Sequence, residues 1–154
     1  MQRHTIAAIA AAIAVGVVAP GVAGAAGGVS SNATFLSPIT VKGKTATLKV
    51  RYQCAPAETV WVSAKELASG KAAAKLTKEG SSKAAAGWWE SHRNRFTCNN
   101  KPQTGTFSID TVEPGSKGKL VAGSAWVQFC VTKGKTEATT KLLLSKSGWV
   151  KVAM

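Results

Sequence analysis

The chain has 154 residues, and its 20 Lys and Arg residues against 7 Asp and Glu residues give a formal net charge of +13. This length suits one domain with a core large enough to fold without a metal or many disulfides. Only three arginines follow residue 25, namely Arg51, Arg93 and Arg95, so bidentate reading of bases or phosphates has little support. The composition argues against specific nucleic-acid binding, and it favours a soluble surface or loose attraction to an anionic one.

Residues 1–25 read as an export signal. A basic start with Arg3 leads into an apolar run over 6–19, and small residues ending in Ala25 follow. We expect cleavage after Ala25, a flexible N-terminal segment over 26–33, and a single domain over 34–154. No second apolar run in the sequence approaches the roughly 18 residues of a membrane span, so we expect a secreted, extracellular or envelope-associated protein without a transmembrane segment.

The first part of the domain alternates between apolar and polar residues with a period of two. The pattern is clearest over 45–54, and it recurs over 58–65. Residues 34–41 precede these segments and contain Pro38, which suits an edge strand or a bulge. These three segments predict consecutive strands and argue against a helical fold.

The stretch from Glu66 to Gly87 is ambiguous, because its alanines and lysines are good helix formers while Gly70 and Gly80 would keep any helix short. We predict a long surface hairpin with strands over 71–78 and 83–91, whose lysines protect an edge from pairing with other chains. A short helix or a loop stays open as an alternative.

The second half returns to strand patterns over 94–98, 104–112, 121–132, 138–144 and 148–153, separated by turn signals. The segment 121–132 is the longest and predicts the central strand. About 8–10 short strands at such intervals predict an all-β fold, an antiparallel β-sandwich of two sheets.

Three cysteines follow the signal, and outside the cytoplasm an oxidised pair is expected. Cys54 and Cys98 each end a predicted strand two residues after an aromatic residue, which makes them the best disulfide pair. Cys130 is out of phase with the apolar row of its strand. It could be a free thiol, an intermolecular link that would make a disulfide dimer, or a core residue moved inward by a bulge; a monomer is the default.

The sequence offers little for catalysis. After the signal it has one histidine, His92, and one aspartate, Asp110, without a Gly-x-Ser-x-Gly turn or paired glutamates. It also lacks zinc-ligand spacing and a phosphate-binding loop. We therefore predict a protein that is not an enzyme and that uses no cofactor or metal.

Aromatic residues form the candidate binding site. Trp88 and Trp89 are adjacent, so on a strand they must point to opposite faces, and Trp61 and Trp126 fall opposite the apolar rows of their strands. Exposed indoles beside Arg93 and Arg95 would make a platform for stacking on sugar rings or for gripping a peptide. The alternative is that these indoles pack inside the second face of a sandwich or beneath the 66–87 segment.

The order of motifs resembles a known group of proteins. The chain has Tyr52-Gln53-Cys54, then a Val-rich strand, Phe96-Thr97-Cys98-Asn99-Asn100, a Thr-Phe-Ser-Ile strand, and Pro114-Gly115 before a long Ala/Val strand. Over 45–133 this is similar to small secreted immunoglobulin-like domains of unknown function from high-GC Gram-positive bacteria. The resemblance implies an immunoglobulin-like β-sandwich and assigns no catalytic residue.

Together these features predict a secreted, non-catalytic module that binds a ligand or associates with the cell envelope. An anionic cell-wall polymer or polysaccharide is the expected partner, because the lysine-rich surface would attract it. An extracellular protein target is the alternative, with the chain acting as a protease inhibitor or an antimicrobial effector through a loop.

Overall fold

The computed structural model describes residues 31–154 except residues 79, 112, 135 and 136. The predicted signal peptide over 1–25 and residues 26–30 of the predicted flexible segment lie outside the described residues. Asn32 and Ala33, also assigned to that segment, belong to the first strand. The described part of the chain contains no helix long and apolar enough to cross a membrane.

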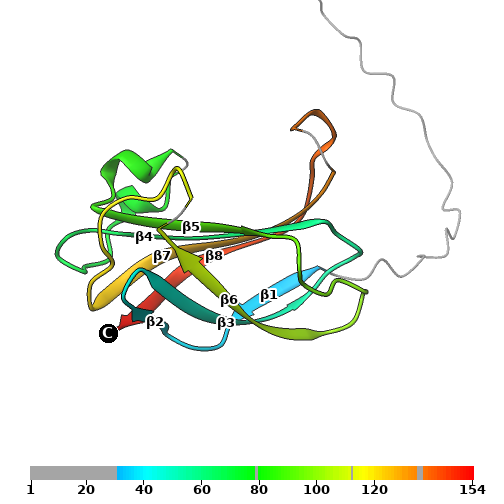
Figure 1. Cartoon of the computed structure of the whole chain (residues 1–154), viewed down its shortest axis with the longest axis horizontal. Helices are drawn as coiled ribbons and strands as arrows, with labels where there is room; N and C mark the ends of the chain where they lie inside the picture. The colour runs from blue at the N-terminus through cyan, green and yellow to red at the C-terminus, as the bar shows by residue number, and fades with distance from the viewer. Residues whose placement is uncertain (1–30, 79, 112, 135–136) are drawn as a thin grey trace, which may run out of the picture.

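The described residues form eight strands and three short 3-10 helices (Figure 1). In chain order they are β1 (Asn32–Phe35), β2 (Ile39–Lys42), β3 (Thr45–Gln53), β4 (Thr59–Glu66), η1 (Ala74–Leu76), η2 (Ser81–Ala84), β5 (Gly87–Arg93), β6 (Gln103–Asp110), β7 (Gly123–Lys133), η3 (Glu137–Thr139) and β8 (Lys141–Ala153). The prediction of an all-β fold is confirmed.

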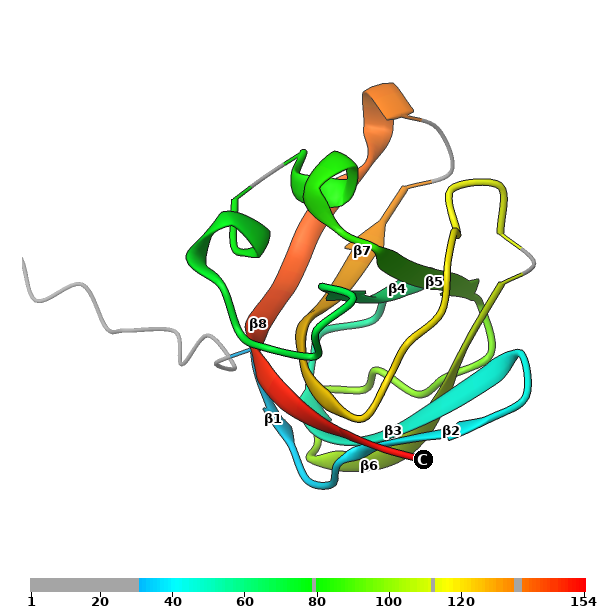
Figure 2. The same ribbon diagram turned by 90° about the vertical axis from the view of Figure 1, so that its left-hand side faces the viewer.

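The strands close into a barrel instead of the predicted pair of separate sheets. Neighbouring strands run in the order β3-β2-β8-β7-β4-β5-β6, and β6 pairs back onto β3. The extra strand β1 pairs with β3 beyond the end of β2. Figure 1 shows the barrel flattened into two layers, with β4, β5, β7 and β8 in one layer, and Figure 2 shows its cross-section from one end.

One junction of this barrel is parallel. The short strand β2 pairs with the end of β8, with Ile39 opposite Val152 and Thr40 opposite Ala153. The sequence pattern predicted only antiparallel neighbours, because local alternation shows which residues face the core and does not show which distant strands meet.

The core lies between the two layers and follows from the period-two pattern. Alternate residues of β3 and β7 are buried while their neighbours are more exposed. Three aromatic rings of the core meet edge to face, since the centroid of Phe107 lies 5.0 Å from that of Phe129 and 5.6 Å from that of Tyr52. The aliphatic part of this core includes Ile39, Leu48, Val50, Val60, Val62, Ile109, Val127, Val131 and Val152.

The junction between β5 and β6 has little backbone pairing. Glu90 and Asp110 form its one strand pair among the described residues. Side chains bridge the remainder: Arg93 donates through Nη2 to Asp110 Oδ2 at 2.9 Å, and Ser116 Oγ accepts from the Glu90 amide and donates to the Asp110 carbonyl. The barrel is therefore closed here by polar side chains.

The predicted disulfide between Cys54 and Cys98 is present, with a Cα–Cα distance of 5.0 Å. It ties the end of β3 to the loop that precedes β6. The amide of Asn100 also donates to the carbonyl of Cys54 at 2.9 Å. The predicted strand over 94–98 is not formed, because this loop turns across the end of the barrel and its backbone pairs with no neighbouring strand within the described residues.

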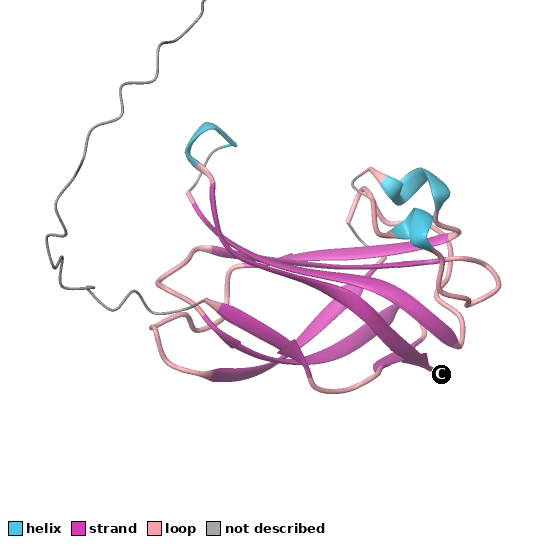
Figure 3. Ribbon diagram, turned by 180° about the vertical axis from the view of Figure 1, so that it is seen from behind, coloured by secondary structure: helices cyan, strands magenta, loops and turns pink. Residues whose placement is uncertain are grey.

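The predicted hairpin over 71–91 is wrong for its first arm. Residues 71–78 contain η1, the predicted second arm over 83–91 begins within η2, and only its later part becomes a strand, β5. Figure 3 shows η1 and η2 outside the barrel, at the end where β8 finishes. The segment is held by packing of Leu76, which is fully buried, and by Ser81, whose Oγ donates to the Leu76 carbonyl at 2.8 Å. A few buried contacts decide this segment more than its helix or strand propensity does.

Two other boundaries differ from the prediction. The expected strand over 34–41 is divided into β1 and β2 around Pro38, which cannot donate to a strand ladder. The expected strands over 138–144 and 148–153 are one long strand, β8, which pairs with β7 along its length and contains a register shift opposite Val131 and Thr132.

Candidate functional site

The outer faces of β5, β4, β7 and β8 carry four of the five tryptophans, and we call this surface the tryptophan face. Cross-strand pairing places Trp88 beside Lys65, Lys65 beside Trp126, and Trp126 beside Trp149. Residues paired across neighbouring strands point to the same side of a sheet. These four side chains therefore form one row across the barrel wall.

Two further rows lie parallel to the first on the same face. The next row along the strands is polar and consists of Glu90, Ser63, Gln128 and Ser147. The third row consists of His92, Trp61, Cys130 and Ser145. Hydrogen-bonding groups are thus flanked on both sides by indole rings, an arrangement that suits a ligand with both apolar and polar faces.

The tryptophan face contains a hollow of about 260 Å³. Its lining combines rings, polar groups and one cation: Trp61, Trp88, Lys65, Gln128, Cys130, Ser145, Leu142 and the start of η2 with the residues beside it, Gly80 to Ser82. Leu142 stands at the surface with 60% of its side chain exposed. The volume of the hollow matches a single small ring, so the hollow suits one residue of a longer chain.

Lys65 is the cation that lines the hollow, and its position is fixed. Its Nζ donates to Ser81 Oγ at 2.8 Å, and Lys65 is only 5% exposed. The folding of the 67–86 segment over the outer face produces this contact. A lysine held in this way places a positive charge at the edge of the hollow and loses little side-chain entropy when a ligand binds.

The indoles of the tryptophan face are oriented in different ways. Trp61 Nε1 donates to Glu90 Oε2 at 3.1 Å, and Trp126 meets Trp149 edge to face with a centroid distance of 5.3 Å. The Nε1 atoms of Trp88 and Trp126 and the Ser63 hydroxyl are buried without a hydrogen-bond partner among the described residues. Packing against Trp149, and not a hydrogen bond, therefore orients Trp126.

Cys130 lies in the third row as a half-buried free thiol, 3.6 Å from Ser145 Oγ. Burial raises the pKa of this thiol, while the contact with Ser145 acts in the opposite direction. The thiol is therefore mostly protonated at neutral pH, which makes it a poor nucleophile. No bulge moves Cys130 into the core. The alternative of a core residue shifted inward by a bulge therefore does not apply.

Trp89, also predicted as a binding residue, points the other way. It is 2% exposed and belongs to the core, and its Nε1 donates to the Gly118 carbonyl at 3.1 Å. The expectation that Trp88 and Trp89 point to opposite faces is confirmed. Trp61, Trp88 and Trp126 are thus brought together, and Trp89 is separated from them by the sheet.

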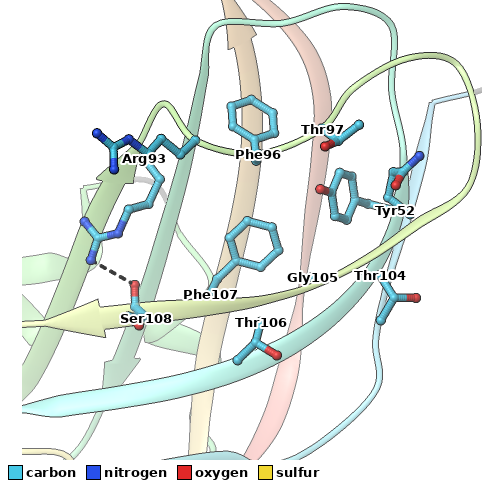
Figure 4. Close-up of a pocket in the computed structure, with 11 residues that line it drawn as sticks. Tyr52, Arg93, Phe96, Thr97, Thr104, Gly105, Thr106, Phe107 and Ser108 are labelled. Carbon is cyan, nitrogen blue, oxygen red and sulfur yellow. Dashed lines mark hydrogen bonds between the residues drawn. The ribbon is translucent and has the colours of Figure 1, made fainter.

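Arg93 and Arg95 lie apart from the tryptophan face, beside a second cavity of about 270 Å³. Figure 4 shows Tyr52, Phe96 and Phe107 around this cavity, with Arg93 at its side. Arg93 is already bound to Asp110. Burial raises the pKa of Tyr52, with a backbone hydrogen bond from Thr97 acting in the opposite direction. The arginines are not available to the tryptophan face.

Several members of the tryptophan face were not predicted as binding residues. Trp149, Gln128 and Lys65 share a face with Trp126 because of strand pairing. Gln128 lies two residues from Trp126, so the period of two contained the signal for it. Trp149 requires knowledge of the register between β7 and β8, which the turn residues did not define.

Titratable residues on and next to this face pair with each other. His92 Nδ1 lies 3.7 Å from Glu113 Oε2, and Asp110 is bound to Arg93. Among the described residues no group of three or more His, Cys, Asp or Glu side chains could hold a metal ion.

Comparison with known proteins adds no assignment. No family model matches the chain, and no curated protein and no solved structure matches it either.

Proposed function

We propose that this protein is a secreted, non-catalytic binding module that holds an anionic polysaccharide or wall polymer of the cell envelope on the tryptophan face. One observation carries the proposal: Trp61 and Trp88 line a single hollow together with the polar groups of Gln128 and Ser145. Aromatic rings stack on the apolar faces of sugar rings, and the polar row supplies hydrogen bonds to hydroxyl groups.

Charge supports an acidic ligand. The chain has a net charge of +13, and Lys65 places a cation within the lining of the hollow. A positively charged surface raises the local concentration of an anionic polymer, while the rings give the contact its specificity. A relationship to secreted immunoglobulin-like domains rests on the order of sequence motifs alone, because the strands close into a barrel (Figure 1).

The first prediction concerns the rings of the hollow. The double substitution Trp61→Ala and Trp88→Ala should weaken co-sedimentation with purified cell walls by at least about tenfold in Kd, because buried aromatic anchors carry most of the energy of such contacts. The measurement is made at about 0.15 M salt, where surface charges are substantially screened. Walls stripped of their anionic polymers serve as the comparison and should bind the wild type weakly.

Two further variants distinguish the contribution of the rings to binding from general electrostatic attraction and from misfolding. Leu142→Glu changes an exposed residue at the hollow and should repel an anionic polymer without disturbing the core. Lys49→Gln with Arg51→Gln removes two exposed charges from β3 and should leave binding nearly unchanged. If Leu142→Glu and the double variant of Lys49 and Arg51 weaken binding equally, charge alone attracts the polymer, which would contradict the proposal. A stable complex with a secreted protease, with no binding to walls, would favour the inhibitor alternative.

A further inference from the structure

A third cavity, of about 410 Å³, opens at the end of the barrel where β8 finishes. Figure 2 views the barrel from this end, with the end of β8 and its C-terminal residue in view. The lining comes from the turn between β2 and β3, from β5, from the segment after β6 and from Met154. It is separate from the hollow on the tryptophan face, which lies on the outside of the barrel wall.

The inner part of this cavity is apolar. Val41, Trp89 and Leu120 line it, and all three belong to the hydrophobic core. Met154 stands over it with 72% of its side chain exposed. A methionine is flexible and adapts its shape to an apolar partner. Cavities of this size and lining, at the mouth of a β-barrel, are typical of sites for apolar small molecules.

The wall of the cavity is preformed. The Trp88 amide donates to the Lys117 carbonyl at 2.9 Å and the Lys117 amide donates to the Trp88 carbonyl at 2.7 Å, which fixes the segment after β6 on β5. Trp89 adds its bond to the Gly118 carbonyl. Gly118 has a φ of +64°, and a Cβ at this position would contact the Ala86 carbonyl, so the close approach requires glycine.

The polar groups of the cavity select the kind of ligand. Lys44 and Lys119 are both exposed lining residues, and the described lining includes no acidic side chain. The Gly118 carbonyl is already engaged by Trp89. A peptide or a sugar placed inside would leave polar groups without partners, which costs free energy. A molecule with one apolar chain and one anionic end matches both parts of the cavity.

We propose that this cavity binds a free, single-chain anionic amphiphile of the fatty-acid class, with its chain against Trp89 and Leu120 and its carboxylate near Lys44 and Lys119. The inference goes beyond the proposed binding of a polysaccharide and does not depend on it. Burial of the chain supplies most of the affinity, and the two lysines set the orientation.

The test is calorimetric titration of the full mature chain with octanoate, decanoate and dodecanoate below their micelle concentrations. Each added methylene should tighten binding about fourfold until the cavity is full. Dodecanol should bind more weakly than dodecanoate, and Lys44→Gln and Lys119→Gln should each weaken dodecanoate by about two- to fivefold. Affinity that does not change with chain length would overturn the proposal.

A blocking variant locates the site. Thr111→Trp places a large side chain on a half-buried lining residue and should abolish binding of dodecanoate, whereas Leu142→Trp, which adds the same side chain to the tryptophan face, should not. If Thr111→Trp does not fold, nuclear Overhauser effects between dodecanoate and the protons of Leu120 and Trp89 in the wild type replace it. Absence of those effects, or binding only to vesicles containing anionic lipid, would refute the site.

Discussion

Glu66 is a carboxylic acid at the end of β4 with no exposed surface. Its Oε2 accepts from the Val121 amide at 2.7 Å, and its Oε1 has no hydrogen-bond partner among the described residues. Burial raises the pKa of this carboxyl above its ordinary value of 4.5, and the bond from Val121 acts in the opposite direction. The folded state therefore holds the proton of Glu66 more tightly than the unfolded state does.

This sign sets the dependence on pH. Since the folded protein binds more protons at this group than the unfolded chain, the contribution of Glu66 to stability is greatest below pH 4.5 and is lost as pH rises through the folded pKa. Glu66→Gln keeps an oxygen that can accept from the Val121 amide. We predict that it raises the free energy of unfolding above that of the wild type, and that this gain is larger at pH 7 than at pH 4. Urea denaturation at the two pH values measures the difference.

The control for Glu66 is Glu58→Gln. Glu58 also accepts a backbone amide, that of Gly134 at 2.9 Å, but it is only half-buried. The same substitution there measures the effect of exchanging a carboxyl for an amide at a half-buried site that accepts a backbone amide. If the free energies of unfolding of wild type and Glu66→Gln differ by the same amount at both pH values, Glu66 titrates alike in the folded and unfolded states, and the prediction is wrong.

At the scale of elements, the strands with regular alternation were the ones that the sequence predicted well. β3 and β7 have the expected inward rows, and β5 places Trp88 and Trp89 on opposite sides as required. The 66–87 segment was predicted poorly, because its structure depends on the burial of Leu76 and Ser81 and on the contact of Ser81 with Lys65, which no local pattern shows. The same lack of long-range information hid Trp149 from the candidate site.

The junction of β5 with β6 is the element most dependent on one side chain. Arg93 Nη2 contacts Asp110 Oδ2, Ser91 Oγ and the Ser108 carbonyl, and Nη1 donates to the His92 carbonyl. A lysine has no planar fork and cannot make these contacts together. We predict that Arg93→Lys lowers the free energy of unfolding by about 1–2 kcal/mol. It should also speed hydrogen exchange over 103–110 more than elsewhere.

Arg95→Lys is the matched control for this junction. Arg95 lines the same cavity as Arg93 but is exposed in the loop after β5. Its substitution should leave stability and exchange within about 0.5 kcal/mol of wild type. Uniform exchange changes along the chain in Arg93→Lys would indicate a global effect and contradict a local opening of this junction.

At the scale of the whole molecule, the disulfide is the covalent link that the sequence located and the structure contains. Cys54 and Cys98 are 44 residues apart in the sequence. We predict that the double substitution Cys54→Ala and Cys98→Ala lowers the free energy of unfolding by up to about 4 kcal/mol, the value expected from closing a loop of this length in the unfolded chain. Denaturation monitored by tryptophan fluorescence measures the loss.

Cys130→Ala separates this effect from a general loss of sulfur. Cys130 is half-buried and unpaired with the other cysteines, so its substitution should cost less than about 1 kcal/mol. An equal loss in both variants would show that the link between β3 and the loop before β6 contributes little.

The closure of the strands into a barrel could not be predicted from the sequence, for a physical reason. An alternating strand specifies an inner and an outer face equally well in a sandwich and in a barrel. The choice depends on whether β6 returns to β3 and whether β2 meets β8, and these contacts involve residues such as Ile39 and Val152 that are far apart in the sequence. Composition and periodicity therefore gave the class of fold, and topology came only with the structure.

The parallel contact between β2 and β8 has a consequence for biogenesis. A chain that emerges from a ribosome or a translocation pore with its N-terminal end first has β2 available long before Val152 and Ala153. Until those residues arrive, one edge of β2 offers free amide and carbonyl groups to any passing strand. The barrel can close at this junction only after β8 has been synthesised, and until then the open edge makes the partly synthesised chain vulnerable to self-association.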